Sequence, residues 1–511
     1  MLLQPSPKTP PLALRVTIFL LTTLEFLQAG MIGFAAGPIM GEIGASPEEY
    51  SLATAVYACV AIATISKQRW LVERLGWRAF VLASLGTFIV GCLICASGQS
   101  YPAFVLGRAV MGLGGAAFMT SGRVIVNHIP PGPHRFTGIK YFATGLASGI
   151  AFAPGLAALV VAHDGRGIFG ILIALAVLAG FSSALSLPAQ PVARDLRSQS
   201  HPILFMALTS GSFLLLYALQ RSQYDFFSDA TMLMAGIACG ALALFYFMRA
   251  VWRHERPLIG IRALTHPRYL AGLGLFTLCY VLLGANNYVL PVLMQRSMGF
   301  AWHSVGKIQT IGMLSAFAAW LVMARVLPKS PSPRKFFVAG FLALAGFGWQ
   351  LARLDGAASL WSDVLPALAC NGIFLIFVMA TTAMQTFRDV QQHESVLSHA
   401  QQLKNMLGQF GTASGVAAST LMLQWRATEH YNLLNVRFSP GDPIYQQTLG
   451  TLTQALASHG AGAHAEPMAV AQLAQLLGQQ SMLLACLDYF GVILVVGVLG
   501  AAVMLYQRLM R

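Results

Sequence analysis

Two oppositely charged residues lie inside long apolar runs of this sequence. Glu25 falls within the run from about Leu14 to Pro38, and Arg108 within the run from about Pro102 to Val126. A guanidinium inside a membrane span costs about 2.5–3.5 kcal/mol on insertion scales, so it needs a partner or an aqueous cavity. A carboxyl group can take up and release a proton, whereas arginine stays charged. We expect Glu25 to be the partner of Arg108, in either a static ion pair or a proton-sensitive contact.

Further polar residues within the apolar runs are candidates for proton coupling or substrate contacts. Asp488 lies near the start of the last run, where it either joins the proton coupling or reaches water. Lys404 either has a gating role or extends its amine to the membrane interface. Amides in spans either line a cavity or bridge helices, and both interpretations stay open. These amides are Gln28, Asn286, Asn287 and Asn371.

The segments that position these residues must be membrane helices. Of the 511 residues, 56% are hydrophobic and only 10% are charged, a composition too apolar for soluble domains. The apolar runs are continuous and long enough to cross a hydrocarbon core of about 30 Å, without the alternation of a β-barrel. We therefore expect an all-α polytopic membrane protein with 14 spans, at residues 14–37, 47–66, 79–98, 102–124, 141–162, 167–186, 202–220, 229–249, 269–291, 304–325, 335–352, 362–386, 398–424 and 481–505.

The basic residues indicate how the helices are oriented. Lys and Arg number 32 against 18 Asp and Glu, giving a net charge of +14 that could suggest a nucleic-acid partner. Most of these basic residues, however, fall in the alternate loops on one side of the predicted bundle, as the positive-inside rule expects for a cytoplasmic side. We therefore expect a lipid bilayer rather than nucleic acid as the partner, both termini in the cytoplasm, and no cleaved signal segment before the first helix.

Polar segments divide the chain into predicted units. Within the outer segment 425–480, residues 468–477 have the spacing of a short amphipathic helix, which either docks on the bundle or contacts a periplasmic partner. The predicted units are a cytoplasmic tail at 1–13, a six-helix bundle at 14–186, a linker at 187–201, two additional helices at 202–249, a linker at 250–268, a second six-helix bundle at 269–505 that includes the outer segment, and a tail at 506–511.

Several motifs resemble those of the major facilitator superfamily, and within it the fourteen-helix, EmrB-type drug:proton antiporters. Arg108-x-x-x-Gly112-x-Gly114-Gly115-Ala116 matches the fourth-helix motif, in which the arginine is associated with proton coupling. Its glycines also suit close helix contacts. In the fifth helix, Gly145-x-x-x-Gly149-x-x-x-Ala153-Pro154-x-x-Ala157-Ala158 is similar to the antiporter motif, with alanine at three of its glycine positions. Pro154 removes a helical hydrogen bond and is a plausible pivot.

Other segments carry looser matches to the same family. Leu71-Val-Glu73-Arg74-Leu-Gly76-Trp-Arg78 resembles the loop between helices two and three, with Glu73 in place of aspartate and Arg69 in place of the first glycine. The resemblance implies a gating role for this loop, whereas anchoring to anionic lipid is the alternative. The segments 255–262 and 401–411 resemble the linker and the thirteenth-helix start of these pumps.

The resemblance implies two six-helix bundles plus two extra helices, and proton-coupled export of amphipathic or toxic small molecules across the bacterial inner membrane. It also implies a periplasmic membrane-fusion adaptor and an outer-membrane channel as partners. In this interpretation, Glu25 takes a proton from outside as substrate leaves, and releases it to the cytoplasm. The alternatives are a substrate-specific metabolite exporter or importer on the same fold and, more remotely, a polytopic membrane enzyme.

Enzyme chemistry finds little support in the sequence. His393-Glu394 and His399 do not form a zinc-protease motif, because that motif needs histidines four residues apart. A phosphate-binding loop of the G-x-x-x-x-G-K-[ST] type is absent from the sequence, and the seven cysteines suit apolar packing better than metal binding. We expect no enzyme activity, no metal and no cofactor, and a proton gradient as the energy source.

Overall fold

The computed structural model describes most of the chain. The described residues are 11–129, 133–189, 201–225, 230–254, 259–327, 329–330, 332–390, 394–436, 438, 441–461 and 464–510. Within them the chain is helical and forms no strand, which confirms the predicted all-α fold class. Most of the linker 187–201, the tail before residue 11 and the family-like segment 255–258 lie outside these residues.

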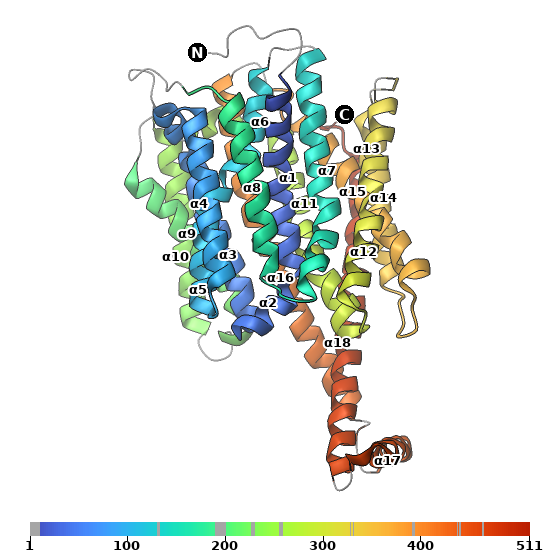
Figure 1. The fold of residues 1–511 in the computed structure, drawn as a ribbon. Coiled ribbons are helices and arrows are strands. Elements are labelled where there is room, and N and C mark those ends of the chain that lie inside the picture. Colours follow the sequence, from blue (N-terminus) through green and yellow to red (C-terminus); the bar gives the residue numbers. More distant parts are fainter. Residues whose placement is uncertain are drawn as a thin grey trace.

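Helices of the first part of the chain pack as one bundle (Figure 1). One of them starts with a capping box: the Ser46 side chain accepts from the Glu49 backbone N–H, the Glu49 side chain accepts from the Ser46 backbone N–H, and Pro47 follows at the first helical position. The helices are α1 Leu12–Phe34, α2 Ala36–Ile43, α3 Pro47–Leu75, α4 Trp77–Ser97, α5 Tyr101–Gly115, α6 Ala117–His128, α7 Pro133–Val161 and α8 Gly167–Ser186.

The remaining helices form a peripheral pair and a second bundle. Proline stands at the first position of several of them, where its missing N–H costs no helical hydrogen bond. They are α9 Pro202–Asp225, α10 Ala230–Arg253, η2 Ile261–Leu264, α11 Pro267–Pro291, η3 Val292–Ser297, α12 Trp302–Met313, α13 Ser315–Val326, α14 Pro333–Leu351, η4 Leu360–Val364, α15 Leu365–Thr386, α16 Glu394–Asn435, α17 Pro443–Leu456, η5 Ala457–Ala461 and α18 Ala465–Tyr506.

Twelve helical stretches in the described residues are long and apolar enough to span a membrane, and each overlaps one of the predicted spans. The two other predicted spans correspond to α14 and α16, which are helices packed within the same bundle. Neither is apolar enough along its length to be counted with the twelve, so the exact count of 14 spans stays a prediction. Large side chains such as Phe181 on α8 and Phe245 on α10 are exposed, as lipid-facing residues would be.

The α9–α10 pair lies at one side of the molecule (Figure 1). α9 packs against α3 and α16, one helix from each predicted bundle, whereas α10 packs mainly on α9. Most of the apolar surface of α10 is therefore left for lipid. These are the helices that the sequence predicts as an additional pair.

The far ends of α16 and α18 project beyond the bundle as an antiparallel pair, with α17 at the tip (Figure 1). The prediction of a separate amphipathic helix at residues 468–477 is wrong, because these residues belong to the continuous helix α18. The outer segment 425–480 is mostly helical in its described residues. Within α18 the helical hydrogen bonds continue, because its one proline, Pro467, stands in the first turn.

Candidate functional site

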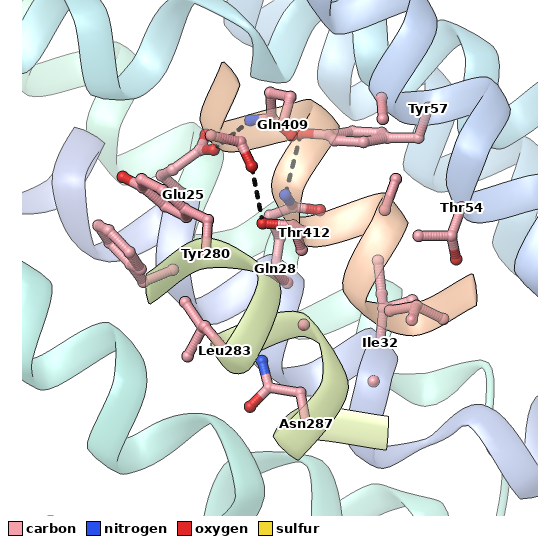
Figure 2. A pocket seen from close by; sticks show the side chains of 18 of the residues that line it. Glu25, Gln28, Ile32, Thr54, Tyr57, Tyr280, Leu283, Asn287, Gln409 and Thr412 are labelled. Carbon is pink, nitrogen blue, oxygen red and sulfur yellow. Dashed lines mark hydrogen bonds between the residues drawn. The ribbon is translucent and has the colours of Figure 1, made fainter. Parts of the chain in front are cut away.

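A central cavity lies where helices of the two predicted bundles meet. Residues of α1, α3, α5 and α6 line it from one bundle, and residues of α11 and α16 line it from the other. Figure 2 shows Glu25 and Gln409 pointing toward one another across this cavity, with Tyr57 and Gln28 beside them. The cavity is therefore lined by both helical bundles, so a motion of one bundle relative to the other would change its shape.

Glu25, on α1, is almost fully buried, with 7% of its surface exposed. Its Oε1 accepts a hydrogen bond of 2.8 Å from Nε2 of Gln409, on α16. Among the described residues, no hydrogen-bond partner contacts its buried Oε2. A buried carboxyl with an unpartnered oxygen is placed to bind a proton, because burying a charge costs more than burying the neutral acid.

Arg108, on α5, is 4% exposed and lines the same cavity. Its Cζ lies 4.2 Å from the centroid of the Tyr57 ring, and its Nη1 lies 3.9 Å from Sδ of Met111. Its Nε has no hydrogen-bond partner among the described residues. No ion pair joins Arg108 to Glu25 in that part of the chain, so a static pair is not present in this conformation, and the proton-sensitive contact stays a prediction. A cation–π contact with Tyr57 supports the guanidinium instead.

The predicted amides divide into two groups. Gln28 and Asn287 line the central cavity, and Nε2 of Gln28 donates to the Tyr57 hydroxyl at 2.9 Å. Asn286 and Asn371 bridge helices: Asn286 donates to Asn371 at 3.4 Å and accepts from the Tyr489 hydroxyl at 2.7 Å. Both of the open interpretations therefore apply, each to different residues.

An amide row on α16 joins the two bundles. Gln402, Asn405 and Gln409 recur at helical spacing, so they lie on one face of α16. Gln402 donates to the Ile65 carbonyl at 3.2 Å, and Asn405 donates to the Thr120 hydroxyl at 2.5 Å. With the Gln409–Glu25 bond, each of the three amides binds a different helix of the first bundle, α3, α6 or α1.

Two predicted glycines stand where helices approach closely. A Cβ added at Gly112 would lie 2.7 Å from the Tyr57 carbonyl oxygen, and one added at Gly149 would lie 2.7 Å from the Thr23 carbonyl oxygen. Neither distance leaves room for a methyl group. These glycines therefore hold α3 and α1, the helices that carry Tyr57 and Glu25, against α5 and α7.

Comparison with known sequences decides the family. The sequence model of the Major Facilitator Superfamily matches residues 18–420. The chain belongs to the major facilitator superfamily. It follows that the molecule is a membrane transporter and not an enzyme.

Two relatives within the superfamily are similar over most of their length. The MFS-type transporter YhcA of Bacillus subtilis is 22% identical over 444 residues, covering 85% of this chain and 81% of YhcA. MdtD of Salmonella typhi, whose name assigns it to multidrug resistance, is 22% identical over 414 residues, covering 80% of this chain and 86% of MdtD.

Solved superfamily structures share the fold at lower identity. A bacterial homologue of the human lysosomal transporter Spinster, in an inward-facing and unoccupied conformation, has a TM-score of 0.58 at 13% identity, covering 97% of this chain and 98% of its own. The peptide transporter PepTSo of the POT family has a TM-score of 0.55 at 16% identity, covering 98% of this chain and all of its own. These likenesses concern the fold alone.

The superfamily-like loop between α3 and α4 is held by protein contacts. Gly76 closes the loop with a φ of 80°, a backbone region that suits glycine. Nε of Arg69 pairs with Glu73 at 2.8 Å, while its Nη1 lies 2.9 Å from Nε2 of His399, on α16. Arg78 donates to the Leu187 carbonyl at 2.8 Å. Arg69 thereby links the two bundles.

Arg74 takes a local position in the same loop. It donates to the Trp70 carbonyl at 3.1 Å, and its guanidinium lies 4.0 Å from the centroid of the Trp70 ring. These are contacts within α3.

Asp488 lies apart from the central cavity. On α18 it pairs with Arg426 at 2.6 Å and with His430 at 2.7 Å, both from the outer half of α16. A third of its side chain is exposed, at 34%. The structure therefore does not bring Asp488 together with Glu25, and its contacts connect the two long helices.

Lys404 and Pro154 face contacts between the bundles. Lys404 is 4% exposed, and its Nζ lies 3.7 Å from Sδ of Met119, so the alternative that its amine extends to the membrane interface is wrong. Pro154 lies inside α7, and a Cβ added at Gly306 of α12 would come 2.8 Å from the Pro154 carbonyl oxygen. Pro154 has no backbone N–H to donate within α7, so this helical hydrogen bond is missing where α7 contacts the second bundle.

Sequence reasoning missed Gln409, Tyr57 and the amide row on α16. The i, i+3, i+7 spacing of Gln402, Asn405 and Gln409 was a usable signal, because that spacing gives a polar face in an otherwise membrane-like helix. Among the parts of the chain that the structure describes, no group of three or more His, Cys, Asp or Glu residues is placed to hold a metal ion.

Proposed function

We propose that the chain is a proton-coupled antiporter that exports amphipathic or toxic small molecules across the bacterial inner membrane by alternating access. The observation that carries this proposal is Glu25: a buried carboxyl, in a cavity lined by both bundles, with one oxygen bonded only to Gln409 and the other without a partner. Membership of a transporter superfamily and the multidrug-resistance name of MdtD support the export of toxic compounds.

Proton binding at Glu25 would change the contacts between the bundles. The ionised carboxylate attracts the Gln409 amide and the nearby cations, whereas the neutral acid holds them less strongly. Because Gln409 belongs to α16 and Glu25 to α1, this change acts directly on a contact that alternating access must remake. Arg108, held over the Tyr57 ring, keeps a positive potential in the cavity in both states.

The same proposal places both termini in the cytoplasm and the projecting α16–α18 pair in the periplasm. The pair is then the surface available to a membrane-fusion adaptor that leads to an outer-membrane channel. Shortening the pair by deleting residues 430–478 should weaken adaptor co-purification while leaving proton-coupled transport in vesicles intact. Loss of both together would contradict the adaptor role.

Everted membrane vesicles test the coupling. Adding an exported compound should dissipate a preformed proton gradient in vesicles with the natural chain, and Glu25→Gln should abolish the response. Asp488→Asn is the matched control, because it neutralises a carboxyl in the last membrane helix outside the cavity. A full response with Glu25→Gln would contradict the proposal, and a reduced folding yield alone would favour a static structural role.

A further inference from the structure

A second cavity lies beside the central one, nearer the end of the bundle where α1 begins and α18 ends. It holds about 310 Å³ and is lined by residues of α6, α7, α11, α13, α15 and α16. Met119 lines both cavities. The two spaces are therefore neighbours, with one methionine side chain between them.

The charged groups of this second cavity have one sign. Arg123, on α6, and Lys404, on α16, line it, and no Asp or Glu does. In the described structure neither makes an ion pair with an acid. Lys404 and Glu25 interact electrostatically, yet they are not close enough to pair, and Glu25 lines only the central cavity. A buried ammonium and a partly exposed guanidinium without a pairing anion carry a desolvation cost.

Weak contacts support both cations in the absence of an anion. The Arg123 guanidinium lies 5.5 Å from the centroid of the Phe142 ring. The Lys404 amine lies 5.1 Å from the centroid of the Phe276 ring, and its hydrogen bond goes to a thioether sulfur, a weak acceptor. Their N–H donors are thus available for a stronger acceptor.

Apart from Gln401, the rest of the lining is apolar and adaptable. Trp320, Met323, Met379 and Phe387 form much of the wall, from α13, α15 and the turn that follows it. Methionine side chains are flexible and polarisable, so they can pack against apolar groups of different shapes. The cavity therefore offers a cationic end and an apolar body within one space.

We propose that this second cavity binds an amphipathic anion, with its acidic group between Arg123 and Lys404 and its apolar body against Trp320 and the methionines. The inference rests on the proposed transport function and names its substrate class. An anionic group regains the charge-assisted hydrogen bonds that both cations lack, whereas a cationic amphiphile would meet two like charges in a site of low dielectric. The anion can come from solution or be an acidic phospholipid of the bilayer.

Binding of matched probes tests the substrate class. The purified full chain is placed in phosphatidylcholine nanodiscs without a proton gradient, and titrated with dansylaminoundecanoate, with its carboxamide, and with its trimethylammonium analogue. The natural chain should bind the carboxylate at least about tenfold more tightly than the ammonium probe, the ratio expected when charge-assisted hydrogen bonds replace like-charge contacts. Equal binding, or tighter binding of the ammonium probe, would overturn the proposal without requiring any variant.

Variants then locate the acidic group. Arg123→Gln and Lys404→Gln should each weaken carboxylate binding about tenfold and change carboxamide binding less than about twofold. Arg325→Gln, at an exposed residue of α13 outside the lining, is the matched control and should change neither. Arg123→Lys and Lys404→Arg keep the charge and should retain most of the binding. Unchanged carboxylate binding in the double glutamine variant would place the anion elsewhere and overturn the site.

Competition by a lipid distinguishes the two possible sources of the anion, and the absence of a gradient distinguishes failure of this inference from failure of the proposed function. Phosphatidylglycerol in the nanodiscs should compete with the carboxylate probe if a bilayer lipid is the occupant, and should not if the occupant is a soluble amphiphile. Both results keep the anionic site. Because binding is measured without a gradient, failure of proton coupling in everted vesicles leaves this test unaffected, and failure here leaves the coupling test unaffected.

Discussion

The central cavity and the outer junction of α16 with α18 each hold one membrane-helix carboxyl, in very different surroundings. Glu25 is 7% exposed and has a single amide donor. Asp488 is 34% exposed on its side chain and contacts both Arg426 and His430. The partners of Asp488 stabilise its ionised form, whereas burial opposes the ionised form of Glu25. The type of residue and its place in a span therefore do not decide its role; its partners do.

The largest expected effect comes from removing the ionisable group of the central cavity. Glu25→Gln should reduce gradient-driven accumulation of substrate to the level of protein-free vesicles, because the amide cannot carry a proton. Exchange of substrate at equal concentrations across the membrane should persist, since it needs no proton. Both quantities are measured in proteoliposomes with radiolabelled substrate. If Glu25→Gln still accumulated substrate against its gradient, Glu25 would differ no more from Asp488 in function than in residue type.

Removing the only donor to Glu25 should have the next largest effect. Gln409→Leu deletes the hydrogen bond that favours the ionised carboxylate, a contact to a charged group that is typically of about 1.5–3 kcal/mol, so proton-driven transport at neutral pH should fall about tenfold. Gln402→Leu is the matched control, because it removes another bond between the bundles without touching Glu25. Similar losses in both variants would show that the amide row acts only as packing.

Neutralising the carboxyl at the outer junction should leave transport nearly intact. Asp488→Asn keeps the side-chain shape and weakens a partly exposed ion pair, and such pairs contribute little to stability. We expect transport within about twofold of the natural chain. The initial rate in proteoliposomes measures this, and a loss as large as that of Glu25→Gln would place Asp488 among the proton-coupling residues.

An effect between those of Gln409→Leu and Asp488→Asn is expected from altering the support of Arg108. Tyr57→Phe keeps an aromatic face beneath the guanidinium and removes the hydroxyl that accepts from Gln28, a bond of about 1 kcal/mol. Transport should fall by less than about fivefold, whereas Tyr57→Leu should lower it further because the aromatic face is lost. Equal rates for the two variants would show that the cation–π contact does not matter.

The sequence predicts helices well here because long apolar runs have few other ways to satisfy their backbone in lipid. Glu25, Gln28 and Arg108 were correctly placed in buried spans, and the glycines at 112 and 149 in close helix contacts. The position of a residue along its helix, however, gives only its depth in the membrane and not which side chains of other helices it contacts. It could not show that Tyr57 of α3 lies beneath Arg108 or that Gln409 reaches Glu25 from α16, 384 residues along the chain.

The errors have equally physical causes. The alternative for Lys404 assumed that its amine extends to the membrane interface. The amine instead lies inside the protein, where it contacts the Phe276 ring and the Met119 thioether. Residues 468–477 were expected to form a separate short helix because they alone in that segment have amphipathic spacing. Antiparallel packing of α16 against α18 lets both helices continue beyond their apolar parts.

One helix connects the central cavity to the far tip of the molecule. α16 carries Gln409 in the cavity and continues without a break to Asn435, next to the α17 tip. At about 1.5 Å per residue, this part of α16 is about 39 Å long, so a tilt of about 10° around the cavity displaces its end by about 7 Å. A small rotation of α16 would therefore give a large displacement at its end. A distance probe fixed near Asn435 should report, from outside the bundle, the rearrangement that we propose to begin at Glu25.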